Sequence, residues 1–500
     1  MTLFFTEMWE RFSYYGMRAL LILFMTKAIV DGGLGFDDKT AGAVYGLYTM
    51  GVYLLALPGG WLADRLFGLK KSVWYGGIII ALGHFMMALP GIQTWITGVS
   101  AAKESLSTLD TTSFFLGLIL IVLGTGLLKP NISSIVGQLY PAGSSKRDAG
   151  FSIFYMGINI GGFIAPIACS TVAEYDMHLG FGLAGLGMVF GLIQYKLTGG
   201  ALDGYGEAPV VVTEVEKSSQ KQLRSITSLI GLIGAVFIAV LFTGVIPINA
   251  SAIAGASGSV IAVVAFGYLG YVIAFGGLEK ADKNKVGVIA ILFLFSAMFW
   301  SGFEQAGSSM TIYTDKYINR ELFGWTIPTT YFQSVNPLFI VLLGPVFAWF
   351  WTSKFGRRLT TPVKMSLGMI LLGIGFLFMY VATFSVDVVG AGDQEQILKK
   401  AALSWLVLTY FFHTIGELCL SPVGLSVVTK LAPVKLASML MGVWMLSSFV
   451  ANIIGGFIAA YVEKLGAGTI FVSIALFVIG LGVLMLLLSR KLSKMMHGVK

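Results

Sequence analysis

The stretch MTLFFTEMWERFSYYGMR (residues 1–18) places charged side chains inside a run of bulky apolar residues. On an α-helix, Glu7, Arg11, Tyr14 and Arg18 share one face about 16 Å long, and Glu10 lies beside it. A charge at the centre of a bilayer costs roughly 2.5–3.5 kcal/mol, so this face cannot contact acyl chains. Three explanations remain: an interfacial amphipathic helix, a structural ion network, or a translocation site, which we favour.

The composition of the whole chain indicates a polytopic membrane protein. Of its 500 residues, 56% are hydrophobic and 12% are charged, whereas soluble domains contain about 25% charged residues. The 63 glycines suit closely packed transmembrane helices. The net charge of +8 is typical of cytoplasmic loops rich in Lys and Arg, and we prefer that explanation to nucleic-acid binding. Cys169 and Cys419 lie far apart and indicate neither a disulfide framework nor a metal site.

Apolar runs of membrane-spanning length follow a six, two, six layout. The first six run over 3–28, 40–66, 72–89, 114–136, 150–172 and 179–197. Two uncharged runs follow a polar stretch, at 226–246 and 258–275. The last six run over 286–314, 331–351, 363–384, 402–429, 438–462 and 470–488. With both termini in the cytoplasm, inner loops carry about three times as many Lys and Arg as outer loops, which supports this topology.

The two sets of six resemble repeats. GGWLADRLFGLKK (59–71) and TSKFGRR (352–358) are short basic turns at matching places in the two halves. Such parallel repeats predict an all-α integral membrane protein with the major facilitator fold and 14 transmembrane helices. We expect an N-terminal six-helix bundle (1–198), a cytoplasmic linker with two extra transmembrane helices (199–285), a C-terminal six-helix bundle (286–490) and a cytoplasmic tail (491–500).

Further charges lie deep in other predicted spans, at Lys129, Glu304 and Glu417, and Pro130 and Pro422 follow two of them. With the first segment included, the buried carboxylates outnumber the buried basic groups by one. A proton that neutralises the extra carboxylate would couple transport to protonation, although pore water is an alternative way to solvate that charge.

The positions of these charges predict the chemistry of a ligand. Basic groups lie in the first half and Glu417 in the second, so a ligand with an anionic and a cationic end would bridge the halves. Asn159 and Asn336 add amide groups that need partners within a span. Aromatic surface comes from Tyr14, Tyr15, Tyr53, Trp300 and Trp444. His413 and Glu417 form a metal-like pair, but no third ligand is evident, and we expect neither metal nor cofactor.

Two motifs resemble those of the proton-dependent oligopeptide transporter (POT/PTR) family of the major facilitator superfamily. Residues 7–16 resemble its ExxERFxYYG motif, and FYMGINIGGFIAP (154–166) resembles its FYxxINxG motif. The resemblance covers essentially the whole chain, including the extra helix pair of bacterial members. It implies a symporter that imports di- and tripeptides with protons by alternating access, between two bundles around a central site.

The resemblance also implies roles for residues at matching positions. The expected proton-coupling residues are Glu7, Glu10, Arg11, Lys129 and Glu304. The expected substrate-binding residues are Arg18 and Lys129 for the peptide carboxylate, Glu417 for its amino group, Asn159 and Asn336 for its backbone, and Tyr14, Tyr15, Tyr53, Trp300, Trp444 and Ser448 for the pocket lining. One departure concerns Tyr45-Gly46, where animal members have His after the Tyr.

Two rivals remain open on the sequence alone. A nitrate or other small-anion carrier of the same family would not need Glu417 opposite the basic pocket. A membrane-embedded enzyme is disfavoured because no nucleophile–base set or metal spacing is evident. We therefore expect a non-enzymatic transporter, functional as a monomer in the cell (inner or plasma) membrane, with peptides, protons and the bilayer as partners and no nucleic acid. The abrupt start is typical of a sequence that lacks a short N-terminal tail.

Overall fold

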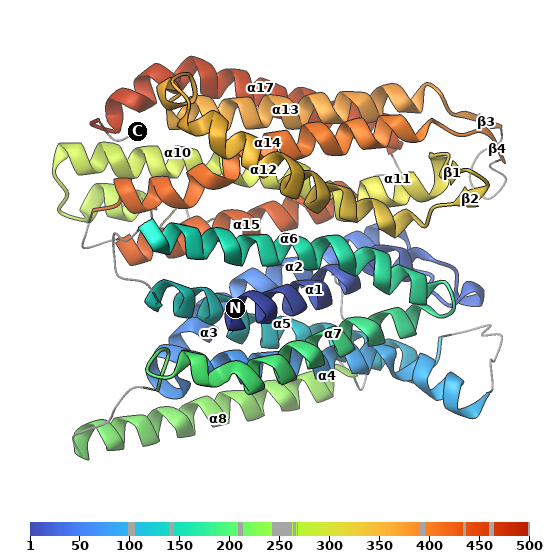
Figure 1. The fold of residues 1–500 in the computed structure, drawn as a ribbon, viewed down its shortest axis with the longest axis horizontal. Coiled ribbons are helices and arrows are strands. Elements are labelled where there is room, and N and C mark those ends of the chain that lie inside the picture. Colours follow the sequence, from blue (N-terminus) through green and yellow to red (C-terminus); the bar gives the residue numbers. More distant parts are fainter. Residues whose placement is uncertain are drawn as a thin grey trace. The chain divides into compact units, whose positions relative to one another are not determined.

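The computed structural model describes residues 1–98, 106–139, 145–208, 214–242, 263, 267, 269–389, 396–433, 437–459 and 465–498. The fold is almost entirely helical (Figure 1). Ten of the described helical segments are long and apolar enough to cross a membrane. The first helix, α1 (Thr2–Thr26), is not among them because it carries Glu7, Glu10, Arg11 and Arg18.

The chain divides into two compact units. Unit 1 comprises residues 1–20, 27–34 and 51–252, and unit 2 comprises residues 21–26, 35–50 and 253–500. The start of α2 therefore belongs to unit 2 and its end to unit 1. Of the predicted extra spans, the first (226–246) is helical in α8 (Glu214–Phe242) as far as residue 242, whereas residues 243–246 and most of 258–275 lie outside the described residues.

The first half of the chain forms the predicted helices, and most of them lie in unit 1. In chain order they are α1, η1 (Ile29–Asp31), α2 (Asp38–Leu54), α3 (Ala56–Leu62), the π-helical turn η2 (Ala63–Phe67), α4 (Leu69–Thr97), α5 (Thr108–Gln138), α6 (Ser145–Ala173) and α7 (Met177–Thr198). The end of α1 and most of α2 belong to unit 2, whereas η3 (Gly199–Leu202) and α8, from the predicted linker, belong to unit 1. The helices α4, α5 and α7 run side by side (Figure 1). Buried apolar side chains from these three helices, such as Val73, Ile132 and Met188, form a shared core.

Helix ends extend beyond the predicted apolar runs because polar residues cap them. The fourth run was expected to begin at residue 114, but α5 begins at Thr108. Ser107 and Asp110 form a reciprocal capping box there, which satisfies amide groups that the first helical turn leaves open. Asp176 caps α7 in a similar way by accepting a hydrogen bond from the His178 amide.

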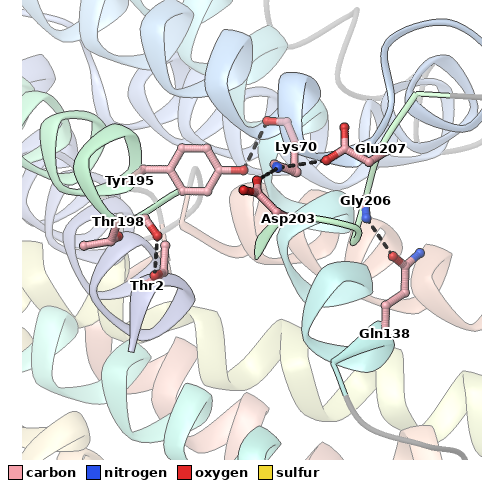
Figure 2. A network of polar contacts seen from close by, with 8 residues as sticks. All are labelled: Thr2, Lys70, Gln138, Tyr195, Thr198, Asp203, Gly206 and Glu207. Atoms are coloured by element: carbon pink, nitrogen blue, oxygen red, sulfur yellow. Dashed lines mark hydrogen bonds and ion pairs between the residues drawn. The ribbon is translucent and has the colours of Figure 1, made fainter. Parts of the chain in front are cut away.

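The segment 199–207, which we call the strap, is bound to the ends of α4 and α5 (Figure 2). Its Leu202 side chain is buried in the unit 1 core. The Lys70 amide donates to the Gly206 carbonyl at a distance of 2.9 Å. The Gly206 amide donates to Gln138 Oε1, also at 2.9 Å (Figure 2). Lys70 Nζ also pairs with Asp203 at 3.1 Å and Glu207 at 2.9 Å. The first part of the predicted polar linker is therefore an ordered element of unit 1.

Unit 2 contains the helices predicted for the second half. They are α10 (Lys280–Phe303), η4 (Glu304–Gly307), α11 (Ser309–Tyr317), η5 (Thr329–Ser334), α12 (Val335–Thr352), η6 (Gly356–Arg358), α13 (Thr361–Thr383), α14 (Leu403–Leu431), α15 (Ala437–Ala459) and α17 (Ala467–Met495). The helix α13 packs against both α14 and α17 (Figure 1). Trp351, near the end of α12, donates from Nε1 to the Leu418 carbonyl of α14.

Two features of unit 2 differ from the continuous spans expected from hydropathy. The predicted span 286–314 is interrupted by the 3-10 turn η4, which begins at Glu304. Two short antiparallel hairpins also connect helices: β1 (Glu321–Leu322) pairs with β2 (Trp325–Thr326), and β3 (Asp387–Val389) pairs with β4 (Gln396–Lys399). Hydropathy averages over a window, so the apolar residues around Glu304 hide the break, and hairpins outside the apolar runs give no signal.

Candidate transport site

The first candidate cluster lies on α1 and consists of Glu7, Glu10 and Arg11. All three residues are buried, with at most 4% of their surface exposed. Arg11 Nε lies 2.7 Å from Glu7 Oε1 and 2.8 Å from Glu10 Oε2. One guanidinium nitrogen therefore serves two carboxylates, and the three residues together carry one negative charge when both carboxylates are ionised.

The carboxylate of Glu10 is incompletely satisfied within this cluster. Neither of its oxygens has a hydrogen bond of good geometry among the described residues, and Glu7 Oε2 also lacks one. A buried carboxylate whose hydrogen-bonding capacity is not filled is costly, and one proton removes its charge and supplies a donor. Lys129 of α5 lies near enough to interact electrostatically with Glu10. The arrangement is thus suited to gaining and losing a proton.

Glycines of α6 allow the charged helix α1 to pack at backbone distance. A Cβ at Gly161 would overlap the Met8 carbonyl oxygen and lie 3.1 Å from Cβ of Arg11. A Cβ at Gly157 would lie 2.9 Å from the Phe4 carbonyl oxygen. Both glycines belong to the predicted motif at 154–166, so the structure brings the two motifs of the sequence together along one helix–helix contact.

Basic and aromatic side chains extend the unit 1 cluster along the face predicted for α1. The Tyr14 ring lies between two guanidinium groups, 5.5 Å from that of Arg11 and 5.9 Å from that of Arg18. The Tyr15 ring contacts Tyr14 edge to face, at 5.2 Å. Lys129 Nζ lies 4.2 Å from the centre of the Tyr53 ring. Such cation–π contacts help to hold these basic groups in place.

The second candidate cluster lies in unit 2, where α12 meets α14. Asn336 Nδ2 donates to Glu417 Oε2 and to Thr414 Oγ1, each at a distance of 3.0 Å. Glu417 is 8% exposed and Thr414 is fully buried. Sequence reasoning selected Asn336 and Glu417 but missed Thr414. Its position three residues before Glu417, on the same helical face, was the available signal.

Glu304 lies at the break between α10 and α11, within electrostatic range of Glu417. The adjacent Gln305, which sequence reasoning also missed, stabilises this break. Its Nε2 donates to the carbonyls of Ser301 and Gly455, and its Oε1 accepts from Ser309. Interrupted helices in membrane proteins leave backbone groups that side chains must satisfy, and such breaks often lie at transport sites.

The remaining predicted residues have more local surroundings. Asn159 is buried and donates to the Tyr155 carbonyl of its own helix, so this bond links it to no other predicted site residue. The Trp300 ring packs edge to face on Phe299 and Phe303. Trp444 is 7% exposed, and the Ser448 carbonyl accepts from Asn452. The contacts of these four residues are local, so their ligand-binding roles stay predictions.

The structure also explains why residue 46 is glycine, at the position where animal members of the family named above have His. Within unit 2, a Cβ at Gly46 of α2 would lie 3.3 Å from both the Asn452 carbonyl oxygen and the Gly456 Cα of α15. A side chain as large as imidazole does not fit between these two backbones. Any proton coupling in this chain must therefore use other groups.

A helical, multi-pass membrane protein with buried ion clusters on its spans has the properties of a membrane transporter. Residues 70–471 match the model of the POT family, and the chain therefore belongs to the POT family. It is 39% identical to a peptide transporter, YePEPT, of Yersinia enterocolitica, over 92% of this chain and 87% of that protein. It is 35% identical to a di-/tripeptide transporter of Lactococcus lactis, over 100% of this chain and 96% of that protein.

Solved structures agree with this assignment. The structure of this chain superposes, with a TM-score of 0.85, on a crystal structure of a POT peptide transporter in complex with sulfate. That similarity has 37% sequence identity and covers 99% of this chain and 95% of that one. The major facilitator fold predicted from the sequence is therefore confirmed.

Proposed function

We propose that this protein is a proton-coupled symporter that imports di- and tripeptides by alternating access. The observation that carries the proposal is the buried pair of carboxylates, Glu7 and Glu10, which share one guanidinium nitrogen of Arg11. This arrangement has no use in a passive channel for neutral solutes. It is suited to a carrier in which a proton and a substrate together neutralise buried charge.

The two units carry opposite charges for the two ends of a peptide. Arg18 and Lys129 in unit 1 are proposed to bind the peptide carboxylate, with Tyr14, Tyr15, Tyr53 and Asn159 around it. In unit 2, Glu417 and Asn336 are proposed to bind the amino group, and Trp300, Trp444 and Ser448 to line the pocket. The carboxylate–amide pair on α12 and α14 supports peptides over nitrate, because an anion gains nothing from a buried carboxylate.

Protons are proposed to act at both units. The proton-coupling residues would be Glu7, Glu10, Arg11 and Lys129 in unit 1 and Glu304 in unit 2. We also propose that the protein works as a monomer in the inner or plasma membrane, with both termini in the cytoplasm. The boundaries 1–198, 199–285, 286–490 and 491–500 describe its bundles, linker and tail. The match to a transporter family speaks against enzymatic activity.

Competition binding on the purified full-length protein tests this proposal, with four competitors: Ala-Ala, its N-acetyl form, its C-terminal amide and nitrate. Loss of one charged partner from a buried group costs on the order of 1–3 kcal/mol, or about tenfold to a hundredfold in affinity. We therefore expect Ala-Ala to compete best, and both blocked peptides to compete at least about tenfold less well. Equal competition by the three peptides, or stronger competition by nitrate, would overturn the proposal.

A further inference from the structure

The hydroxyl of Thr414 is oriented by its own helix. Thr414 Oγ1 donates to the Tyr410 carbonyl at a distance of 2.7 Å. A threonine hydroxyl has a single proton to donate, so Oγ1 is left only with acceptor capacity toward Asn336. Because Thr414 is fully buried, water does not compete for this bond. The hydroxyl is thus a fixed acceptor at the end of the Asn336 side chain.

A fixed acceptor determines which way the Asn336 amide faces. Its two partners, Thr414 Oγ1 and Glu417 Oε2, lie 3.0 Å from the same nitrogen, Nδ2. A flipped amide would place Oδ1 against the Thr414 oxygen, where neither atom has a proton to share. In the observed orientation Nδ2 faces both partners, so Oδ1 is left as the acceptor atom of the same amide. Thr414 imposes this orientation whether Glu417 is ionised or protonated, because the Thr414 contact does not involve the carboxylate.

We propose that Thr414 is a positioning residue for amino-group recognition: it locks the Asn336 amide so that Oδ1 joins Glu417 in accepting a primary ammonium group. The inference rests on the proposed function, because it assumes that the amino end of a peptide is bound here. Thr414 touches no substrate itself. It acts by keeping a second acceptor, beside the carboxylate, in the orientation that an ammonium group requires.

The test compares Thr414→Val with Thr414→Ser in the full-length protein. Valine keeps the shape of threonine but removes the hydroxyl, whereas serine keeps the hydroxyl. We expect Thr414→Val to weaken Ala-Ala binding about fivefold to twentyfold and to change N-acetyl-Ala-Ala binding less than about twofold. Thr414→Ser should restore the wild-type preference for the free amino group. An equal loss for both ligands would show a merely structural role and overturn the inference.

The same helix offers a matched control. Thr409 is also fully buried, and the single proton of its hydroxyl lies within reach of two backbone carbonyls, those of Gly375 at 3.0 Å and Trp405 at 2.9 Å. Thr409→Val should leave the ratio of the two affinities unchanged, even if it lowers the melting temperature. A change in the ratio equal to that of Thr414→Val would mean that removal of any buried hydroxyl from α14 has this effect.

A double-mutant cycle with Asn336→Ala isolates the route of the effect. If Thr414 acts through the amide, Thr414→Val should change the affinity ratio by less than about twofold once Asn336 is alanine. If Thr414→Val changes the affinity ratio in the Asn336→Ala protein as much as in the wild type, Thr414 does not act through the Asn336 amide. The wild-type protein separates the two proposals. If it binds the free and acetylated peptides equally, the proposed function fails. If it discriminates but Thr414→Val does not alter discrimination, only this inference fails.

Discussion

At the residue scale, the central feature is the competition of two buried carboxylates for one guanidinium nitrogen. Glu7 and Glu10 both lie within 2.8 Å of Arg11 Nε, and all three side chains are shielded from solvent. Removing one partner from a buried ion cluster is strongly destabilising, whereas protonation of one carboxylate is not. Substitutions that mimic the protonated state should therefore separate binding from coupling.

Glu10→Gln tests this separation. Glutamine is neutral and keeps the shape of a protonated Glu, so we expect gradient-driven uptake of Ala-Ala into proteoliposomes to fall at least about tenfold. Counterflow exchange needs no net proton movement and should persist. The exposed Glu174, at the end of α6, supplies the control, since Glu174→Gln should retain both activities. Normal gradient-driven uptake by Glu10→Gln would contradict a coupling role.

At the element scale, the contact between α1 and α6 explains why two distant motifs act together. The motif at 154–166 contributes two glycines, at 157 and 161, and both face backbone atoms of α1. Small residues at helix interfaces in membranes allow dispersion contacts that larger side chains prevent. The position of the Glu7–Glu10–Arg11 cluster therefore depends on residues that carry no charge.

Gly161→Leu should strongly reduce uptake, although it replaces no charged residue. A side chain at this position overlaps the Met8 carbonyl, so α1 must shift away from α6. We expect both gradient-driven uptake and counterflow to fall more than about tenfold. The matched variant is Gly480→Leu on α17, where nothing lies within 4 Å of the added Cβ. Transport by Gly161→Leu within twofold of wild type would show that the close contact is not required.

The strap gives a second prediction at this scale. Gly68 has φ +75°, and an added Cβ would lie 2.7 Å from the carbonyl carbon of Glu207 in the strap. Gly68→Ala should lower the free energy of unfolding by about 1–3 kcal/mol. Lys70→Ala should cost less than about 1 kcal/mol, because Asp203 and Glu207 are 78% and 59% exposed.

Thermal unfolding in detergent measures both effects, with Gly204→Ala as the control. Gly204 also has positive φ, at +85°, but nothing lies within 4 Å of its added Cβ. Gly204→Ala therefore introduces the backbone strain without a close contact to neighbouring atoms. If Gly68→Ala and Gly204→Ala lower the melting temperature equally, the close packing of the strap on Gly68 contributes nothing.

At the scale of the whole molecule, buried charge is distributed unequally between the units. Among the charged residues of the proposed site, unit 1 holds the buried Glu7, Glu10 and Arg11 and the half-buried Arg18 and Lys129, whereas unit 2 holds the buried Glu417 and the half-buried Glu304. A peptide with two charged ends adds no net charge, so in the proposed mechanism a proton neutralises the carboxylate in excess. Import should then depend on the proton gradient.

Uptake by wild-type proteoliposomes should therefore collapse when a protonophore is added. We expect accumulation of Ala-Ala under an inward proton gradient to fall at least about tenfold, to the level of protein-free vesicles. Exchange of internal for external peptide should continue under the same conditions, which shows that the protein remains active. Equal accumulation with and without the protonophore would rule out proton-driven import.

The sequence by itself determined the features that follow from local periodicity and hydropathy. The shared face of Glu7, Arg11, Tyr14 and Arg18 follows from 3.6 residues per turn, and the structure places Tyr14 between the two guanidinium groups as this spacing requires. The helical spans follow from apolar runs that match the bilayer thickness. Both signals lie within one segment, so no knowledge of neighbouring segments was needed.

Only the tertiary structure decided how distant segments satisfy each other's polar groups. Asn336 and Thr414 are 78 residues apart, and nothing local in either segment indicates that they share a hydrogen bond. The break at Glu304 depends on Gln305 reaching the Gly455 carbonyl, 150 residues away. The strap likewise exists because Leu202 finds a core built from α4, α5 and α7. The physical reason is common to all three: a buried group is stabilised by whichever partner the packing of other helices brings within about 3 Å.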